Sequence, residues 1–125
     1  MHRSRLGCLV IDCPVKDVAD VARFWGAALG GKVEVDDEGR YAQIHNQGDL
    51  KVLVQAVDHP ARVHLDIESD NKEAEVARLE ALGARVIDRV KTWVIMEAPS
   101  EHRFCIVNPQ SDVFERRAKT WDDDA

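Results

Sequence analysis

The sequence predicts an α+β fold built from two tandem βαβββ modules, and three observations support this fold class. In residues 63–86, alternating apolar and polar residues are followed by a helical pattern and then by a second strand-like stretch. The helical part, EVARLEALGARV, is echoed near the start of the chain by DVARFWGAALGGKV. After each helix the pattern predicts strand, turn, strand, turn and strand. Because one such module leaves a sheet face uncovered, pairing two modules is the physical solution.

The first module is expected over about residues 6–57. Residues 6–13 predict a buried strand, which Pro14 ends because proline lacks a backbone donor. A helix is predicted from Asp17 to the Gly30-Gly31 pair, with a core face of Val18, Val21, Trp25 and Leu29 and with Phe24 beside it. Three strands follow, at residues 32–35, 40–45 and 51–57, separated by polar turns.

The second module is expected over about residues 62–109, after a connection that contains His59 and Pro60. Its first strand points Val63, Leu65 and Ile67 to one side and His64, Asp66 and Glu68 to the other. Asp70 or Asn71 can cap the helix, whose apolar stripe is predicted as Val76, Leu79 and Leu82, and Gly83 can end it.

Strands at residues 85–90, 92–97 and 103–107 complete the second module, and the domain made of the two modules is assigned to residues 1–109. Residues 110–125 form a charged C-terminal tail that carries Phe114 and Trp121. This tail is predicted to be a partly ordered surface arm, with the aspartates 122–124 in solvent.

Composition restricts the classes of function. A chain of 125 residues with 45% hydrophobic and 32% charged residues is typical of one soluble globular domain. A formal net charge of −6, without a basic face, argues against nucleic-acid binding. No apolar stretch approaches the roughly 20 residues of a membrane span. An odd number of cysteines and the lack of a signal-like apolar segment predict a cytoplasmic location.

The sequence resembles the vicinal oxygen chelate superfamily in four stretches, which are HLDI, the helix EVARLEALGARV, and the later WVIM and FCIV. More narrowly, they resemble its glyoxalase-like domain branch, which stands beside bleomycin-resistance proteins and ring-cleaving dioxygenases. The resemblance covers about residues 6–109. It implies that the strands curve into a half-barrel with the helices outside. It also implies a homodimer, with Tyr41, Trp93 or the tail at the subunit interface.

The resemblance further implies a divalent metal, held by a histidine on the first strand of each module and by glutamate or glutamine on the last. By position, His64 matches the second-module histidine. Gln55 matches the first-module glutamate, although Leu53 lies on the same face. Cys8, or Val10 in another alignment, takes the other histidine position, and Cys105 stands where glutamate is usual.

The set Cys8, Gln55, His64 and Cys105 is softer than the usual ligands and closer to a zinc site. Nickel, manganese and iron stay open as alternatives for one divalent metal. Strand cysteines more often act as small buried hydrophobic residues. The leading interpretation is therefore that the usual metal set has been lost.

His64 is the main candidate for a functional side chain, and Asp66 or Glu68 beside it could act as a general base. The alternative is that Asp66 or a backbone carbonyl simply holds the imidazole. Tyr41, His45 and Trp93 are predicted to line a ligand cavity, with cross-strand packing or a subunit contact as the alternative.

Together these patterns predict a glyoxalase-like protein that binds a small molecule. One alternative is a metal-dependent glyoxalase-type lyase or dioxygenase that acts on a small oxygenated substrate. Another is a drug-sequestering resistance protein, whose acidic charge would suit a cationic drug.

Overall fold

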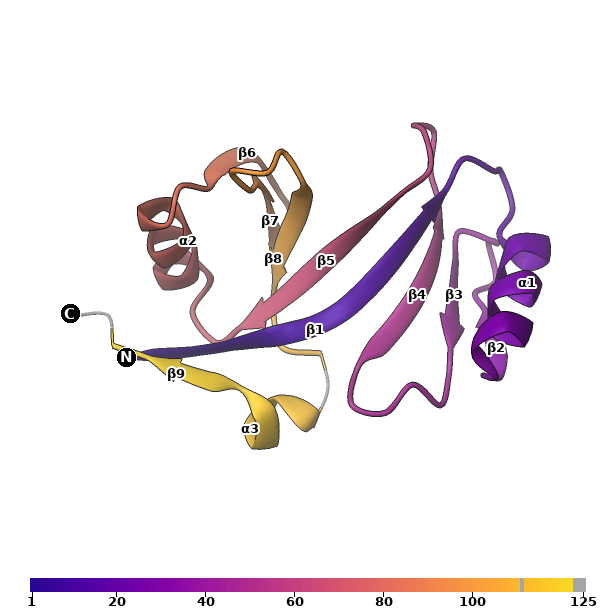
Figure 1. The fold of residues 1–125 in the computed structure, drawn as a ribbon, viewed down its shortest axis with the longest axis horizontal. Helices are drawn as coiled ribbons and strands as arrows, with labels where there is room; N and C mark the ends of the chain where they lie inside the picture. The colour runs from indigo at the N-terminus through magenta and orange to yellow at the C-terminus, as the bar shows by residue number, and fades with distance from the viewer. Residues whose placement is uncertain (111, 123–125) are drawn as a thin grey trace. The chain divides into compact units, whose positions relative to one another are not determined.

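The computed structural model describes residues 1–110 and 112–122. These residues form strands and helices in the following order (Figure 1): β1 (His2–Cys13), α1 (Ala19–Leu29), β2 (Val33–Val35), β3 (Tyr41–Ile44), β4 (Lys51–Ala56), β5 (Arg62–Ser69), α2 (Lys72–Ala81), β6 (Arg85–Val90), β7 (Trp93–Glu97), β8 (Arg103–Val107), α3 (Val113–Arg117) and β9 (Lys119–Trp121). The predicted α+β class is confirmed, and each half has the predicted order of strand, helix and three strands. None of the helices in the described ranges has the length and apolar character needed to cross a membrane.

The chain divides into two compact units, which are described separately. One unit comprises residues 8–64, and the other comprises residues 1–7 together with the chain from Leu65 onward. Strands β1 and β5 each contribute residues to both units.

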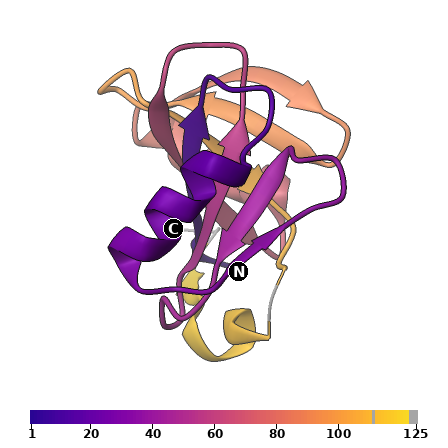
Figure 2. The same cartoon turned by 90° about the vertical axis from the view of Figure 1, so that its right-hand side faces the viewer.

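In the unit of residues 8–64, the strands follow the order β2, β3, β4 and β1, with β1 parallel to β4. Helix α1 packs against one face of these strands, and Figure 2 shows it lying along them. Val18 and Ala22 meet Ile44 and Val54 in this core. Phe24 is 63% exposed and Leu29 is 42% exposed, so their prediction as core residues is wrong. The Phe24 ring makes an edge-to-face contact with Trp25, with the centroids 5.1 Å apart.

In the other unit, the order is β5, β8, β7 and β6, with β5 parallel to β8. Asn71 caps α2, since its Oδ1 accepts a hydrogen bond from the backbone N–H of Ala74 at 3.1 Å. Val76 packs with Met96 and Ile106 in the core, as the apolar stripe predicts. Leu82 is 67% exposed, which contradicts its predicted place in that stripe.

The described part of the C-terminal segment is folded, so the prediction of a partly ordered arm is wrong there. Strand β9 pairs antiparallel with the start of β1, and Trp121 lies opposite His2. Phe114 of α3 is only 3% exposed, and the Trp121 indole N–H donates to Ser4 Oγ at 2.8 Å. Two residues of the predicted solvated triple aspartate, 123 and 124, lie outside the described residues.

A buried carboxylate joins α2 to these terminal strands. The Glu75 side chain is inaccessible to solvent; it accepts two hydrogen bonds from Arg78 at 2.8 Å and one from His2 Nε2 at 2.7 Å. The Arg78 guanidinium stacks on Trp121, 3.8 Å from the ring centroid. Burial acts to raise the pKa of Glu75, but the hydrogen bonds from Arg78, His2 and Ser4 outweigh it and hold that pKa below the ordinary value.

Candidate functional site

The sheet of residues 8–64 has one face covered by α1 and one face without a helix. Alternate residues of each strand, such as Ala42, Val54 and Cys13, point into the core beneath α1. The residues between them point to the opposite face. We call this opposite side the helix-free face, and it carries polar residues such as Gln55 together with apolar ones such as Val10 and Leu53.

Four polar residues form a continuous row across the helix-free face. Tyr41 of β3 lies opposite Gln55 of β4, and Gln55 lies opposite Asp12 of β1. The Gln55 amide donates to the Tyr41 hydroxyl at 3.2 Å, and the His64 Nδ1–H donates to Asp12 Oδ2 at 2.7 Å. Strand register therefore places Tyr41, Gln55 and Asp12 side by side, and the hydrogen bond to Asp12 adds His64. We call these four residues the polar row.

Asp12 is the least accessible member of the row, at 2% exposed. Its Oδ2 also lies 3.8 Å from Arg62 Nε and 3.9 Å from His59 Nε2. Its Oδ1 is buried and has no hydrogen-bond partner among the described residues. A buried carboxylate oxygen without a donor is costly and uncommon, so this atom marks a place where a donor from outside the chain would be stabilised.

His59 and Cys13 are two neighbours of the Asp12 carboxylate. The His59 Nδ1–H donates to the carbonyl of Pro60 at 2.8 Å, and its Nε2 lies 3.3 Å from an Arg62 guanidinium nitrogen. Burial raises the pKa of the Cys13 thiol, and the charge of Asp12 raises it further. Cys13 is therefore an unreactive thiol in the core.

The structure does not bring the predicted metal ligands of this unit together. Cys8 lies opposite Lys51, whereas Gln55 lies opposite Asp12, four residues further along the same strands. Four residues of strand span about 13 Å, which is too far for two ligands of one ion. The Cys8 thiol bonds to the carbonyl of Leu9 at 3.7 Å. Cys105 belongs to the other unit, where it lies opposite Asp66 and Ile95.

Asp66 and Glu68 follow His64 on the same strand, β5. The His64 imidazole is hydrogen-bonded to Asp12, which the sequence pattern did not single out as its partner. Glu68 is 3% exposed and accepts hydrogen bonds from Arg5 at 3.3 Å and from the backbone N–H of Gln110 at 2.9 Å. Glu68 is therefore engaged in holding its own unit together.

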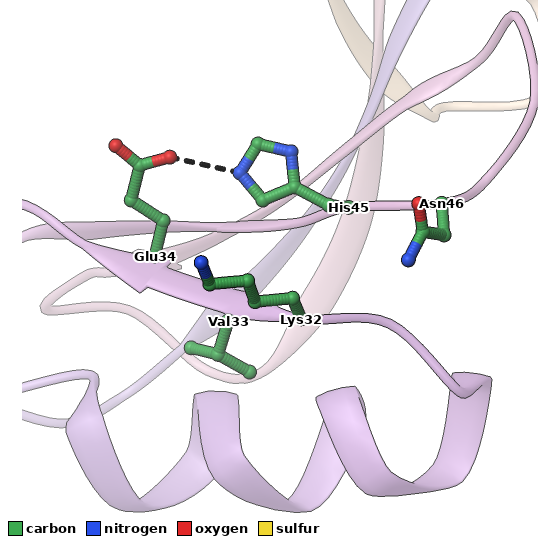
Figure 3. Close-up of a pocket in the computed structure, with 5 residues that line it drawn as sticks. All are labelled: Lys32, Val33, Glu34, His45 and Asn46. Carbon is green, nitrogen blue, oxygen red and sulfur yellow. Dashed lines mark hydrogen bonds and ion pairs between the residues drawn. The ribbon is translucent and has the colours of Figure 1, made fainter.

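The residues predicted to line one cavity are distributed over separate places. His45 borders an open depression of about 610 Å³, where its Nε2–H donates to Glu34 at 2.8 Å (Figure 3). In the same view the side chain of Val33, which also lines this depression, points toward the helix. Tyr41 lines a different depression of about 190 Å³ with Lys51 and Leu53. Trp93 lies in the other unit, on β7.

A larger depression of about 790 Å³ lies at the edge where β1 and β4 end. Gln55 of the polar row lines it, and so do Lys16, Arg40, Asp58 and His59. The sequence pattern did not single out Lys16, Arg40 or Asp12. A carboxylate inside the apolar run LGCLVIDC was the available signal for Asp12, because a charge in a buried strand needs a specific partner.

Comparison with known families identifies a relationship over most of the chain. A family model described as a glyoxalase-like domain matches residues 8–107. Among curated protein sequences, none matches this chain.

Several solved structures share the fold. A structure described as an NAD-dependent benzaldehyde dehydrogenase from Legionella pneumophila has 16% identity and a TM-score of 0.61, covering 82% of this chain and 98% of its own. A hypothetical protein from Bacillus halodurans has 16% identity and a TM-score of 0.59, covering 87% and 98%. An extradiol ring-cleaving dioxygenase from B. fuscum has 20% identity and a TM-score of 0.52, and the match covers 87% of this chain but 33% of the dioxygenase. At these identities the likeness concerns the fold alone.

Proposed function

Since the chain belongs to the glyoxalase-like domain family, we propose that it is a small-molecule-binding protein whose ligand lies against the polar row. The family match is also the relationship expected from HLDI and the second helix, so the resemblance to the vicinal oxygen chelate superfamily is confirmed. Binding against a helix-free sheet face requires polar groups at defined positions, and strand register supplies them here.

The observation that carries the proposal is that the two carboxylate oxygens of Asp12 are hydrogen-bonded differently. One carboxylate oxygen is bonded to His64, and the other is buried without a donor in the described part of the chain. Keeping such an oxygen costs stability unless a ligand satisfies it. The ligand is therefore expected to carry a hydroxyl or N–H group that donates to Asp12 Oδ1.

Asp12 also determines what the neighbouring imidazole can do. The hydrogen bond at Nδ1 orients the ring and turns Nε2 away from Asp12. In return, the His64 N–H fixes one oxygen of the Asp12 carboxylate. His64 is thus placed to hold Asp12 in position for the ligand.

The divalent metal of the superfamily is not part of this proposal. Cys8 and Gln55 lie too far apart to share an ion, and the Gln55 amide is bonded to Tyr41. Within residues 8–64, the predicted ligands therefore do not fit a common metal centre. A metal-dependent lyase or dioxygenase remains the competing function that an experiment must address.

The first test is metal analysis of untagged protein, in the wild type and in His64→Ala. We expect less than about one tenth of an equivalent of any transition metal in both. Near-stoichiometric zinc, nickel, manganese or iron that disappears in His64→Ala would overturn the proposal and favour the metal-dependent enzyme.

The second test is a thermal-shift screen with a panel of small hydroxylated compounds. A hit should raise the melting temperature of the wild type and of the control Glu34→Gln, but not that of Asp12→Asn. Glu34 is a suitable control because it also pairs with a histidine of this unit, but on the exposed strand β2, opposite Gln43 and not opposite Asp12 or Gln55. Hits that stabilise Asp12→Asn as strongly as the wild type would place the ligand elsewhere and contradict the proposal.

A further inference from the structure

Two positively charged side chains, those of Arg40 and Lys16, lie beside the polar row and indicate which kind of ligand it binds. We propose that this ligand is an elongated hydroxylated organic acid, whose anionic group is held by Arg40 and Lys16. The inference rests on the proposed function and names the substrate class of the same site.

Strand direction brings Lys16 and Arg40 to one edge of the sheet. Strands β1 and β4 are parallel, so their carboxyl ends, at Cys13 and Ala56, lie at the same edge. Strand β3 runs antiparallel to β4 and begins there, and the backbone N–H of Ala56 donates to the carbonyl of Arg40 at 2.9 Å. Lys16 follows β1 directly. Both cations line the depression of about 790 Å³ that Gln55 also lines.

The charges that line this depression are available to a ligand. In the described part of the chain, no hydrogen bond or ion pair engages the side chain of Lys16 or Arg40. His59 is engaged by Pro60 and Arg62, and Asp58 is the one acidic residue of the lining. The lining is thus locally positive on a chain whose formal net charge is −6. Such a local excess attracts an anion to this place while the rest of the surface repels it.

The polar row continues directly into this depression. Gln55 belongs to both, and it lies between Asp12 and Tyr41, the residue after Arg40. Neighbouring strands are about 4.8 Å apart, so Asp12 on β1 and the start of β3 are separated by about 10 Å. A ligand that donates to Asp12 Oδ1 and also reaches Arg40 must therefore be elongated.

Arginine suits the anionic end of such a molecule. Its planar guanidinium can donate two parallel hydrogen bonds to one carboxylate, and lysine adds a second positive charge. The same lining disfavours a cationic ligand, because Arg40 and Lys16 would repel it. The inference therefore stands against sequestration of a cationic drug.

Three probes that share a phenol and differ in charge test this inference. They are 3-(4-hydroxyphenyl)propanoate, its neutral amide and the cation tyramine. Binding is measured by NMR titration of ¹⁵N-labelled wild type, Arg40→Gln, Asp12→Asn and the control Arg23→Gln. Arg23 is an exposed arginine on α1 of the same unit, so its loss changes net charge equally without touching the depression.

We expect the propanoate to bind wild type and Arg23→Gln at least about tenfold more tightly than the amide, and tyramine to bind most weakly. Arg40→Gln should reduce the affinity for the propanoate to about that of the amide. The amide resonances of residues 16, 40 and 56 should shift on binding.

The possible failures are distinguishable. Equal affinities for propanoate and amide, both lost in Asp12→Asn, would overturn the inference and leave the proposed function standing. If Arg40→Gln weakens propanoate binding and Asp12→Asn does not, the result would support the anion site. It would also contradict the role of Asp12 in the proposed function. Absence of binding by every probe would overturn this substrate class. The proposed function is tested separately by the thermal-shift screen with hydroxylated compounds.

Discussion

Asp12 Oδ2 and His64 Nδ1 lie 2.7 Å apart although 52 positions separate them in the sequence. The same unit contains a second carboxylate–imidazole pair, Glu34 and His45, at 2.8 Å. The side chain of Asp12 is 2% exposed, whereas that of Glu34 is 72% exposed. The two pairs have the same chemistry and differ in their access to water. Comparing them therefore shows how burial changes the contribution of such a pair to the free energy of unfolding.

Removal of the buried carboxylate should destabilise the protein much more than removal of the exposed one. We expect Asp12→Ala to lower the free energy of unfolding by about 2 kcal/mol, because His64 loses a charged hydrogen-bond partner away from water. Glu34→Ala should cost less than about 0.5 kcal/mol, since water replaces the lost partner. Urea denaturation followed by circular dichroism checks both values. Equal costs would show that Asp12 is as well solvated as Glu34.

The buried Glu75 predicts a pH-dependent stability. Its folded-state pKa is lowered, so its stabilisation is complete above the ordinary glutamate value of 4.5 and is lost as the pH falls through the lower folded-state value. Glu75→Gln should therefore cost about 3 kcal/mol at pH 7, and this cost should shrink below pH 4.5.

Urea denaturation of the wild type and Glu75→Gln between pH 7 and pH 3 measures this effect. Glu80→Gln is the matched control, because Glu80 lies on the same helix but is exposed. The control should follow the wild type at every pH. A cost for Glu75→Gln that stays constant down to pH 3 would contradict the lowered pKa.

The folded C-terminal segment predicts that Phe114 contributes to stability. Phe114 is 3% exposed beneath Arg3, whose guanidinium lies 5.5 Å from the ring centroid. Phe114→Ala should lower the free energy of unfolding by about 3 kcal/mol. Phe24→Ala, at a site that is 63% exposed, should cost less than about 1 kcal/mol. If Phe114→Ala were as mild as Phe24→Ala in denaturant titrations, the segment would not be docked in solution.

Substitutions at the two adjacent glycines after α1 test two different effects, steric crowding at Gly31 and backbone strain at Gly30. A Cβ on Gly31 would lie 2.1 Å from the backbone oxygen of His45, which cannot move aside without shifting the strand. Gly31→Ala should cost more than about 2 kcal/mol. Gly30 has φ +73° and open space around it, so Gly30→Ala should cost about 1 kcal/mol from strain alone. The opposite ranking in thermal denaturation would contradict the close approach.

Local sequence patterns were sufficient for most elements. The alternation from Val63 onward predicts β5, and the cap and stripe around Asn71 and Val76 predict α2. The repeat of EVARLEALGARV predicts the matching order of elements in the first half. These features depend on neighbours within a few positions, so no tertiary information was needed. Phe24, Leu82 and the C-terminal segment were mispredicted, because hydrophobicity does not show which face another element covers.

The sequence by itself determined the α+β class, the glyoxalase-like relationship and His64 as a residue of interest. Only the tertiary structure decided that Asp12 holds His64, that Cys8 and Gln55 lie four residues apart in register, and that Lys16 and Arg40 meet at one edge. The physical reason is that side-chain period is a local property of a strand. Register and strand order are set by hydrogen bonds between segments far apart in the chain, and those bonds determine which side chains become neighbours.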